Sequence, residues 1–343
     1  VYDSDPADSG IAPARTWVLE TKYDKTYHQV LAKLEEAYLV SGDAFYKTAS
    51  GESMLPLGIV TIRECKAPNG YLLNETLYVR KIQEDGTDQE TVTGEQVPVV
   101  PNTPQKIQIE IQKVDSETDK GEAQGAAALK GAEYEVRDQA GNVVETLITD
   151  KKGYAKTKEL PLGNYTVKET KASNGYLLDE KEYPIKGEAK DEENRVFLYK
   201  TKSKETVIRG DVELIKLREN ENEDEDTLHG LEGVEFTFTS KTTGKTVAKI
   251  VTDKNGYATT ASKEHPRGSL PFDTYLVEET KHPEGLKPIE PFEVTIQEEG
   301  IVWKGIYKED KLIVSPITVV KMDASTGKKD SDKRCGIPSA RCG

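Results

Sequence analysis

The chain contains many short segments in which apolar and polar side chains alternate. Val, Ile, Thr and Tyr are frequent in these segments, and turn-forming sequences such as QAGN, KKGY and SNGY separate them. A period of two places alternate side chains on one face of a strand, and these residue types suit a pleated, half-buried surface. Short strands about ten residues apart predict an all-β fold made of β-sandwiches.

One segment departs from this pattern. The sequence HQVLAKLEEAYL, residues 28–39, has the apolar spacing of a helix. It lies where the repeat described next is incomplete, so its conformation is left open.

The same blocks of sequence recur in the same order along the chain. LPLGIVTIRECKAPNGYLL at 55–73 and LPLGNYTVKETKASNGYLL at 160–178 agree at 13 of 19 positions, and SLPFDTYLVEETKHPEGL at 269–286 is a looser copy. Upstream of the last two copies, GAEYEV and TDKKGYAK correspond to GVEFTF and TDKNGYAT. A fixed order of blocks indicates tandem repeats of one domain.

The repeats divide the chain into predicted domains. Each opens with a strand that ends in a lysine, and Lys113, Lys216 and Lys321 are 103 and 105 residues apart. We predict a first domain, truncated before its opening strand, two complete domains, and the start of a truncated fourth domain with an atypical tail, over residues 1–104, 105–208, 209–315 and 316–343. The chain opens on Val1, which we interpret as a sign of processing or of a fragment.

The alternation places ionisable side chains on the inward face of these strands. Lys113 is in phase with Ile109 and Ile111, and Glu169 is in phase with Tyr165 and Val167. The same phase holds at the equivalent positions of the other domains, namely Lys216, Lys321, Glu64 and Glu279. Burying an isolated charge is costly, so such groups pair, become neutral or react.

Two interpretations of this pattern remain open. In the first, the positions are exposed strand ends or buried salt bridges. In the second, a lysine amine among apolar side chains gives up its proton and becomes a nucleophile. A protonated glutamate beside it would hydrogen-bond the carbonyl of an Asn or Asp and move protons. The product is an amide bond between two side chains, and the recurrence of the pair favours this second interpretation.

The blocks IQKVD, GAEYEV, TDKKGYA, LPLGNYTVKET and KASNGYLL resemble the Cna-B-like domains of collagen adhesins, also known as SpaA-type pilin or prealbumin-like domains of Gram-positive surface proteins. The resemblance covers nearly all of residues 40–325. It implies tandem immunoglobulin-like sandwiches of seven strands, each with an internal Lys–Asn or Lys–Asp isopeptide bond. In this family the lysine is on the first strand, the glutamate in the YTVxET strand and the Asn or Asp on the last strand.

Carried over residue by residue, the resemblance fits the domains unequally. In the first domain Glu64 and Asn102 match, but the lysine is not placed, since Lys22 and Lys25 do not lie in a first-strand motif. In the third domain Lys216, Glu279 and Asp310 match all three positions.

The second domain lacks the acyl partner. Lys113 and Glu169 match the family, whereas eleven residues before Lys216, at the offset that separates Asn102 from Lys113, stands Glu205. Asn194 is a poor substitute. An isopeptide bond in this domain is therefore in doubt.

Other candidate chemistry is weak. The acidic run ENENEDEDT at 219–227 lacks the spacing of a calcium loop and is typical of a solvated hairpin loop. Four scattered histidines have no metal-ligand spacing, and we expect no cofactor. Cys65 is interpreted as a free thiol. The role of Cys335 and Cys342 is left open between a small disulfide loop and an altered fourth domain.

The composition argues against some classes of binding partner. A net charge of −14 argues against nucleic acid or an anionic membrane, and no apolar run is long enough to span a bilayer. The favoured function is a structural stalk segment of a Gram-positive cell-surface adhesin or pilus-like protein, stabilised by isopeptide bonds outside the cell. The alternative is an adhesin module that binds extracellular matrix or glycan. Catalysis of any other reaction is not expected.

Overall fold

The structure of the chain is a computed structural model that describes residues 15–25, 29–31, 34–82, 100–219 and 228–308. Within these residues the elements are strands, apart from one short 3-10 helix, η1 (Glu36–Tyr38). The described chain forms two compact units, which we treat separately. One holds 15–113, 130–172 and 178–203, and the other holds 114–129, 173–177 and 204–308, with the gaps given above.

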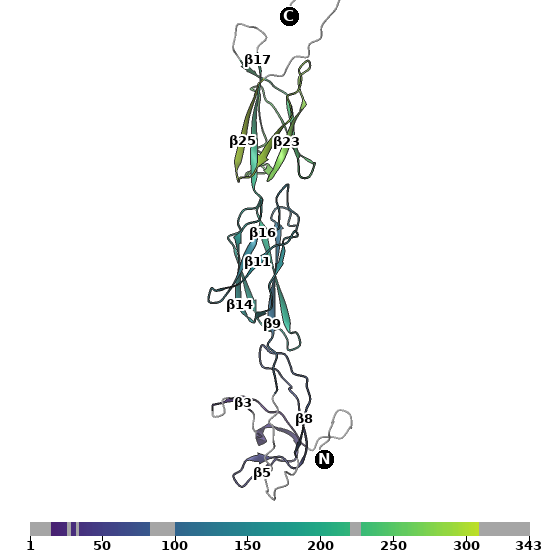
Figure 1. Ribbon diagram of the computed structural model, residues 1–343, viewed down its shortest axis with the longest axis vertical. Helices are drawn as coiled ribbons and strands as arrows, with labels where there is room; N and C mark the ends of the chain where they lie inside the picture. Colours follow the sequence, from purple (N-terminus) through teal and green to yellow (C-terminus); the bar gives the residue numbers. More distant parts are fainter. Residues whose placement is uncertain (1–14, 26–28, 32–33, 83–99, 220–227, 309–343) are drawn as a thin grey trace, which may run out of the picture. The chain divides into compact units, whose positions relative to one another are not determined.

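The second domain is built from two sheets, as the alternation predicts (Figure 1). One sheet has the order β11-β10-β14-β15, formed by Val143–Ile148, Glu133–Asp138, Gly163–Lys171 and Glu182–Gly187. In the other, the opening strand β9 pairs with three strands. These strands are β9 (Lys106–Asp115), β12 (Tyr154–Lys156), β13 (Leu160–Pro161) and β16 (Val196–Glu205).

The two short strands β12 and β13 are halves of one interrupted strand. Both pair with β9, and the register shifts by one residue between them. At the interruption the Thr157 hydroxyl accepts a hydrogen bond from the Ile109 N–H at 2.9 Å, while the Thr157 N–H donates to the Ile109 carbonyl. Counting the halves together gives seven strands, the number that the family resemblance implies.

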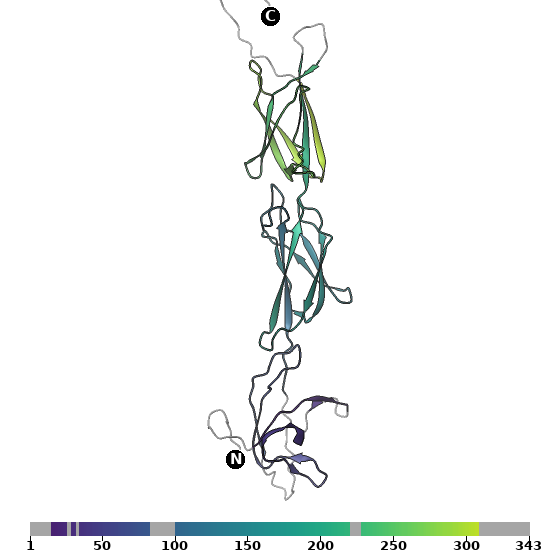
Figure 2. The ribbon, with the colours of Figure 1, turned by 180° about the vertical axis from the view of Figure 1, so that it is seen from behind.

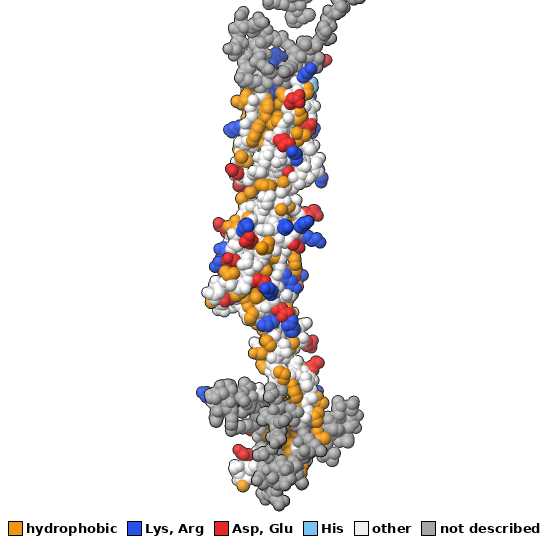
Figure 3. All heavy atoms as spheres, viewed as in Figure 1, with side chains coloured by type: hydrophobic (Ala, Val, Ile, Leu, Met, Phe, Trp, Pro, Cys, Tyr) orange, Lys and Arg blue, Asp and Glu red, His pale blue; other side chains and the backbone are white. Residues whose placement is uncertain are grey.

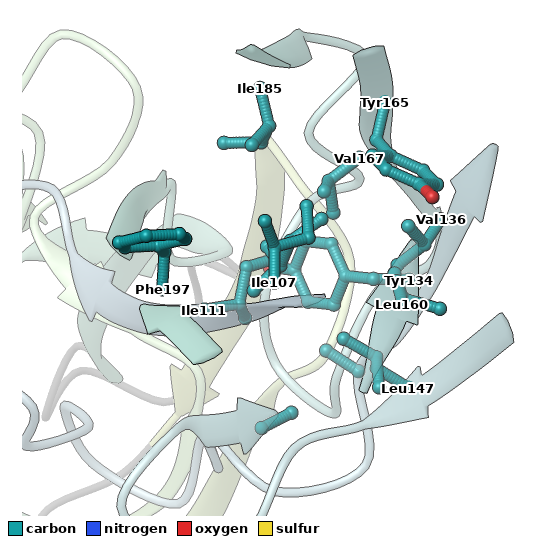
Figure 4. Close-up of a cluster of buried hydrophobic side chains, with 13 residues drawn as sticks. Ile107, Ile111, Tyr134, Val136, Leu147, Leu160, Tyr165, Val167, Ile185 and Phe197 are labelled. Carbon is teal, nitrogen blue, oxygen red and sulfur yellow. The ribbon is translucent and has the colours of Figure 1, made fainter. Parts of the chain in front are cut away.

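The core of this sandwich confirms the period-two pattern. Ile107, Ile109 and Ile111 on β9 are fully buried, and the residues between them are half-buried. Figure 4 shows their cluster, in which side chains from both sheets converge. Tyr134 and Val167 belong to it and are also fully buried. Each such side chain contributes about 1.5–3 kcal/mol to folding.

The third domain repeats this architecture. One sheet has the order β20-β19-β23-β24, formed by Thr246–Val251, Glu235–Ser240, Asp273–Lys281 and Phe292–Ile296. In the other, the opening strand β17 (Arg209–Glu219) pairs with β18 (Leu228–Gly230), β21 (Tyr257–Thr259), β22 (Leu270–Pro271) and β25 (Ile301–Lys308). Figure 2 shows the same strands from behind. The first and last strands, β17 and β25, are parallel over Gly210–Leu217 and Ile301–Lys308.

A buried tyrosine fixes the same corner in both sandwiches. The Tyr165 hydroxyl donates to the Pro161 carbonyl at 2.9 Å, and the Tyr275 hydroxyl donates to the Pro271 carbonyl at 2.6 Å. The LPLG and LPFD sequences before them thus form a short strand, a tight turn and the start of a long strand.

The first domain is paired differently within the described residues. Its strands form four two-stranded sheets, which pair β1 with β4, β2 with β3, β5 with β6 and β7 with β8. Their bounds are Arg15–Trp17, Leu39–Gly42, Lys22–Asp24, Gln29–Leu31, Tyr46–Lys47, Ser53–Met54, Gly58–Ile62 and Tyr78–Ile82. The described part of the helix-like segment 28–39 contains β3, η1 and the first residue of β4, so tertiary pairing overrides the helical spacing there.

The repeated GYLL sequences lie against the segments that join consecutive domains. Leu72 donates its N–H to the Thr103 carbonyl at 2.9 Å, and Leu177 donates to the Thr206 carbonyl at the same distance. The preceding tyrosines form isolated bridges, Tyr71 with Pro104 and Tyr176 with Val207. The same motif therefore binds backbone groups of the joining segment in both cases.

A buried arginine opens the third domain. Arg209 is 5% exposed, and its guanidinium donates to both carboxylate oxygens of Glu117 at 2.9 and 2.6 Å. It also donates to the Gln124 side chain and to the carbonyls of Gly268 and Ser269. Because its guanidinium donates to all of these groups, Arg209 fixes residues 114–129 against the start of β17.

This contact makes a prediction about pH. The hydrogen bonds from Arg209 hold the pKa of the Glu117 carboxyl below its usual value of 4.5. A depressed pKa stabilises the fold above that value, and the contribution is lost as pH falls. We expect Glu117→Gln to lower the free energy of unfolding by about 1–2 kcal/mol near neutral pH, and the difference from wild type to shrink below about pH 4.5.

Urea unfolding at about pH 7 and about pH 3 measures both values. Glu122→Gln, an exposed change in the same loop, is the control and should have little effect. A Glu117→Gln deficit of equal size at both pH values would contradict the assignment.

Candidate functional site

The second domain brings Lys113 and Glu169 together in its core. Lys113 lies on β9 in phase with the buried isoleucines, and Glu169 lies on β14 of the opposite sheet, in phase with Val167. Their side chains have no exposed surface, and Lys113 Nζ lies 3.0 Å from Glu169 Oε1. The alternation of the sequence is thus sufficient to aim both groups at one point.

The third domain places the equivalent pair in the same way. Lys216 on β17 and Glu279 on β23 have fully buried side chains, and Lys216 Nζ lies 3.9 Å from Glu279 Oε2. This distance is that of an ion pair and is longer than a hydrogen bond.

The first domain brings a glutamate to its amide partner. The Asn102 side chain donates from Nδ2 to Glu64 Oε1 at 2.8 Å, and both residues are half-buried. Lys22 does not complete this pair, since its exposed side chain forms an ion pair with Glu20 at 3.7 Å. Lys25 is exposed as well.

A backbone donor holds each of the three glutamates, a feature that sequence reasoning missed. The N–H groups of Asn74, Asp179 and Ile289 donate to Oε2 of the glutamate ten residues earlier, at 2.6, 2.7 and 3.3 Å. Because every residue except proline carries this N–H, residue type gives no signal for it. The only regular feature that could have identified the donor is its constant separation of ten residues from the glutamate.

The position of the missing acyl partner in the second domain is occupied by a buried side chain. Glu205 ends β16 and has no exposed surface. Its backbone carbonyl accepts a hydrogen bond from the Ser116 N–H at 2.8 Å. Asn194 lies in an exposed turn before β16, where its side-chain amide donates to Asp191.

Several predicted residues lie outside the described residues. These are Asp310, Lys321, Cys335 and Cys342, together with residues 220–227 of the acidic run. Their predicted roles stay predictions. Cys65 is described, and it is an exposed free thiol.

Among the described residues, the His, Cys, Asp and Glu side chains form no group of three or more that is placed to hold a metal ion. The same part of the chain has no helix that is long and apolar enough to cross a membrane. On the face shown in Figure 3, basic and acidic side chains are interspersed over the described surface of the second and third domains.

The chemistry available to the site follows from its burial. An ammonium and a carboxylate in an apolar core are stabilised by each other, and transfer of one proton makes both neutral. The neutral pair contains an amine nucleophile beside a carboxylic acid. Such a pair is equipped for acyl transfer to the amine when a carboxyl or carboxamide group lies within reach.

Comparison with known families decides the classification. The model of the SpaA prealbumin-like fold domain matches residues 107–202 and 215–310, which together exceed half of the chain. The chain belongs to this family. Its two matched ranges contain the buried pairs of the second and third domains.

Three solved structures illustrate the proteins to which this chain is similar. The Bacillus anthracis TIE protein is 25% identical over 87% of this chain and 48% of its own, with a TM-score of 0.55. The minor pilin GBS52 of Streptococcus agalactiae is 16% identical over 62% and 99%, with a TM-score of 0.28. A C-terminal fragment of the pilus adhesin SpaC from Lactobacillus rhamnosus GG is 14% identical over 61% and 99%, with a TM-score of 0.36.

The chain spans about half the length of the Bacillus anthracis protein. No curated protein sequence matches the chain.

The buried pair of the second domain gives a prediction about stability. Replacing Glu169 by leucine removes the carboxylate that lies 3.0 Å from Lys113 and should cost about 3–5 kcal/mol, because breaking a buried ion pair by removing one member is strongly destabilising. The double variant Lys113→Met with Glu169→Leu should recover most of this loss, since a well-packed apolar pair of similar volume replaces the ion pair.

The matched control is Glu182→Gln. Glu182 lies 3.0 Å from Lys168, the distance found in the buried pair, but on the surface, so the change should cost less than about 1 kcal/mol. Urea unfolding of the four proteins measures these differences. Equal effects of Glu169→Leu and Glu182→Gln would show that the buried pair is not coupled to stability.

Proposed function

We propose that the chain is a structural stalk segment of a Gram-positive cell-surface adhesin or pilus-like protein, in which amide bonds between side chains brace the domains. The observation that carries the proposal is the recurrent inward-facing glutamate, which lies beside a buried lysine in two domains and beside a half-buried asparagine in the other. Membership of the SpaA prealbumin-like family supports it. The domain boundaries at residues 105–208 and 209–315 are part of this proposal.

In the third domain the proposed bond joins Lys216 to Asp310. The neutral Lys216 amine attacks the Asp310 carboxyl carbon, the C–N bond forms, and one carboxyl oxygen leaves as water. Glu279 donates a proton to the departing oxygen and recovers one from the amine nitrogen, so it ends unchanged. No cofactor or oxidant is needed, and the reaction occurs once in each molecule.

In the first domain Asn102 is the proposed acyl donor and Glu64 the proton carrier. The leaving group is then ammonia, because the side-chain amide loses its nitrogen. The lysine that attacks is not assigned within the described residues. In the second domain we propose that Lys113 and Glu169 stay a non-covalent pair, since a glutamate, Glu205, stands at the position of the acyl partner.

The strand arrangement fits a role under tension. In the third domain β17 and β25 are the first and last strands, and they lie parallel in one sheet. Pulling the start of β17 and the end of β25 apart therefore loads their hydrogen bonds together. A bond from Lys216, near the end of β17, to a residue just beyond β25 would carry that load covalently. Such a bond also limits the unfolded ensemble, as a disulfide does, by a few kcal/mol.

Mass measurement of the intact chain tests the bonds. We expect the third domain to lower the mass by one water, and peptide mapping to recover a branched peptide that contains Lys216 and Asp310. Glu279→Ala should keep the unmodified mass at this site, because the proton carrier is absent.

Glu278→Ala is the matched control, since it changes the neighbouring side chain of the same strand, which points to the other face. It should crosslink as the wild type does. A wild-type mass equal to the sum of the residues would overturn the crosslinking proposal for every domain. Retention of collagen or a glycan by the chain would instead favour the adhesin alternative over a purely structural stalk.

A further inference from the structure

We infer that the backbone N–H ten residues after each glutamate is a positioning group for the crosslinking reaction. It holds Oε2 and so orients the carboxylate, and in the first two domains this leaves Oε1 to face the side chain that the mechanism uses. The inference rests on the proposed function and extends it to residues that neither the family pattern nor the alternation identifies. These residues are Asn74, Asp179 and Ile289.

In the first two domains, where the backbone contact is shortest, the two oxygens of the glutamate contact different partners. In the first domain Glu64 Oε2 accepts from the Asn74 N–H at 2.6 Å, and Oε1 accepts from Asn102 at 2.8 Å. In the second, Glu169 Oε2 accepts from the Asp179 N–H at 2.7 Å, and Oε1 lies 3.0 Å from Lys113 Nζ. In both sites one oxygen binds the backbone and the other faces the side chain that the mechanism uses.

The third domain keeps the backbone donor but does not divide the two oxygens in this way. Ile289 donates to Glu279 Oε2 at 3.3 Å, and Lys216 Nζ lies 3.9 Å from the same oxygen. The longer backbone contact thus accompanies the longer lysine contact. Pro288 precedes Ile289, where the first two domains have leucine.

The donor residue is itself anchored in the first two domains. The Asn74 side chain donates to the Tyr78 hydroxyl at 3.0 Å and to the Pro101 carbonyl at 2.9 Å. Asp179 Oδ2 accepts from the Tyr183 hydroxyl at 2.6 Å and from Ser203 at 3.1 Å.

In both cases the anchor joins the donor to the strand after it and to the segment that carries the last-strand residues. Ile289 replaces this polar anchor with an apolar side chain that packs on the core of the third domain.

The chemical consequence concerns the position of one proton. When the glutamate is protonated, the oxygen that accepts from the backbone is its carbonyl oxygen, so the proton resides on the other oxygen. In the first domain that oxygen is Glu64 Oε1, which faces the Asn102 amide. The nitrogen and oxygen of an amide are interchangeable in assignment, and in the other orientation Glu64 Oε1–H donates to the Asn102 carbonyl. This polarises the carbon that the lysine attacks.

The test removes one N–H and keeps the fold. Ile289→Pro deletes the donor, and Ile289→Ala trims the side chain but keeps the N–H. Each protein is recovered unfolded in urea and diluted into buffer, and the loss of water at Lys216–Asp310 is followed by mass against time and pH. We expect Ile289→Ala to react at close to the wild-type rate, and Ile289→Pro to react at least about tenfold more slowly.

The pH profile separates positioning from packing. Loss of a donor to the carboxylate favours its protonated form, so the alkaline fall of the rate should shift to higher pH in Ile289→Pro and not in Ile289→Ala. Equal rates and equal profiles for the two variants would overturn the inference while leaving the crosslink in place. A wild-type chain without any mass loss would overturn the proposed function and, with it, the role of the donor.

A second measurement covers the case in which Ile289→Pro does not fold. In the wild-type chain, a hydrogen-bond scalar coupling between the Asp179 amide nitrogen and the Glu169 carboxyl carbon reports the contact directly by NMR. Detection of this coupling, with slow exchange of the Asp179 amide proton, supports the hydrogen bond from the Asp179 N–H to Glu169. Absence of the coupling, with fast exchange of that proton, overturns the positioning role of this N–H independently of any crosslink.

Discussion

The burial of an ammonium and a carboxylate in an apolar sandwich core is the interaction on which the rest of the structure depends. Lys113 and Glu169 come from opposite sheets and have no exposed side-chain surface, as do Lys216 and Glu279. Neither group could remain charged there alone. Each pair therefore connects the two sheets, and it also places an amine beside an acid in the buried core. These are the conditions that amide formation between side chains requires.

The surrounding fold serves to place these groups. Strand alternation delivers the lysine and the glutamate to the same point, the tyrosine corners at Tyr165 and Tyr275 set the start of the strand that carries the glutamate, and a backbone donor ten residues later holds the carboxylate. The same turn contains the GYLL motif, which in the first two domains is hydrogen-bonded to the segment leading to the next domain. One repeated sequence block thus links the buried pair to the chain connection.

Much of this was accessible from the sequence, for physical reasons. A period of two specifies which side chains face the core, so the all-β class, the sandwiches and the buried Lys113–Glu169 and Lys216–Glu279 pairs could be predicted. The backbone donors could not, because every non-proline residue supplies the same N–H. The Arg209 contact with Glu117 was also missed, since it depends on how a loop meets the next strand. The conformation of segment 28–39 could not be decided from its spacing, because helical spacing over a short stretch gives way to strand pairing.

Pulling single molecules of the chain from both ends tests the central claim, that the buried pair of the third domain lies beside a covalent bond between its first and last strands. We predict that the residues between Lys216 and Asp310 never add to the extended length, so this domain gives no unfolding step of its own. Glu279→Ala should restore the step. The second domain, which has no proposed bond, should give a step of its own in both proteins. A second wild-type step of roughly 300 Å, the length of about 94 extended residues, would contradict the covalent bond and leave the Lys216–Glu279 pair as a salt bridge alone.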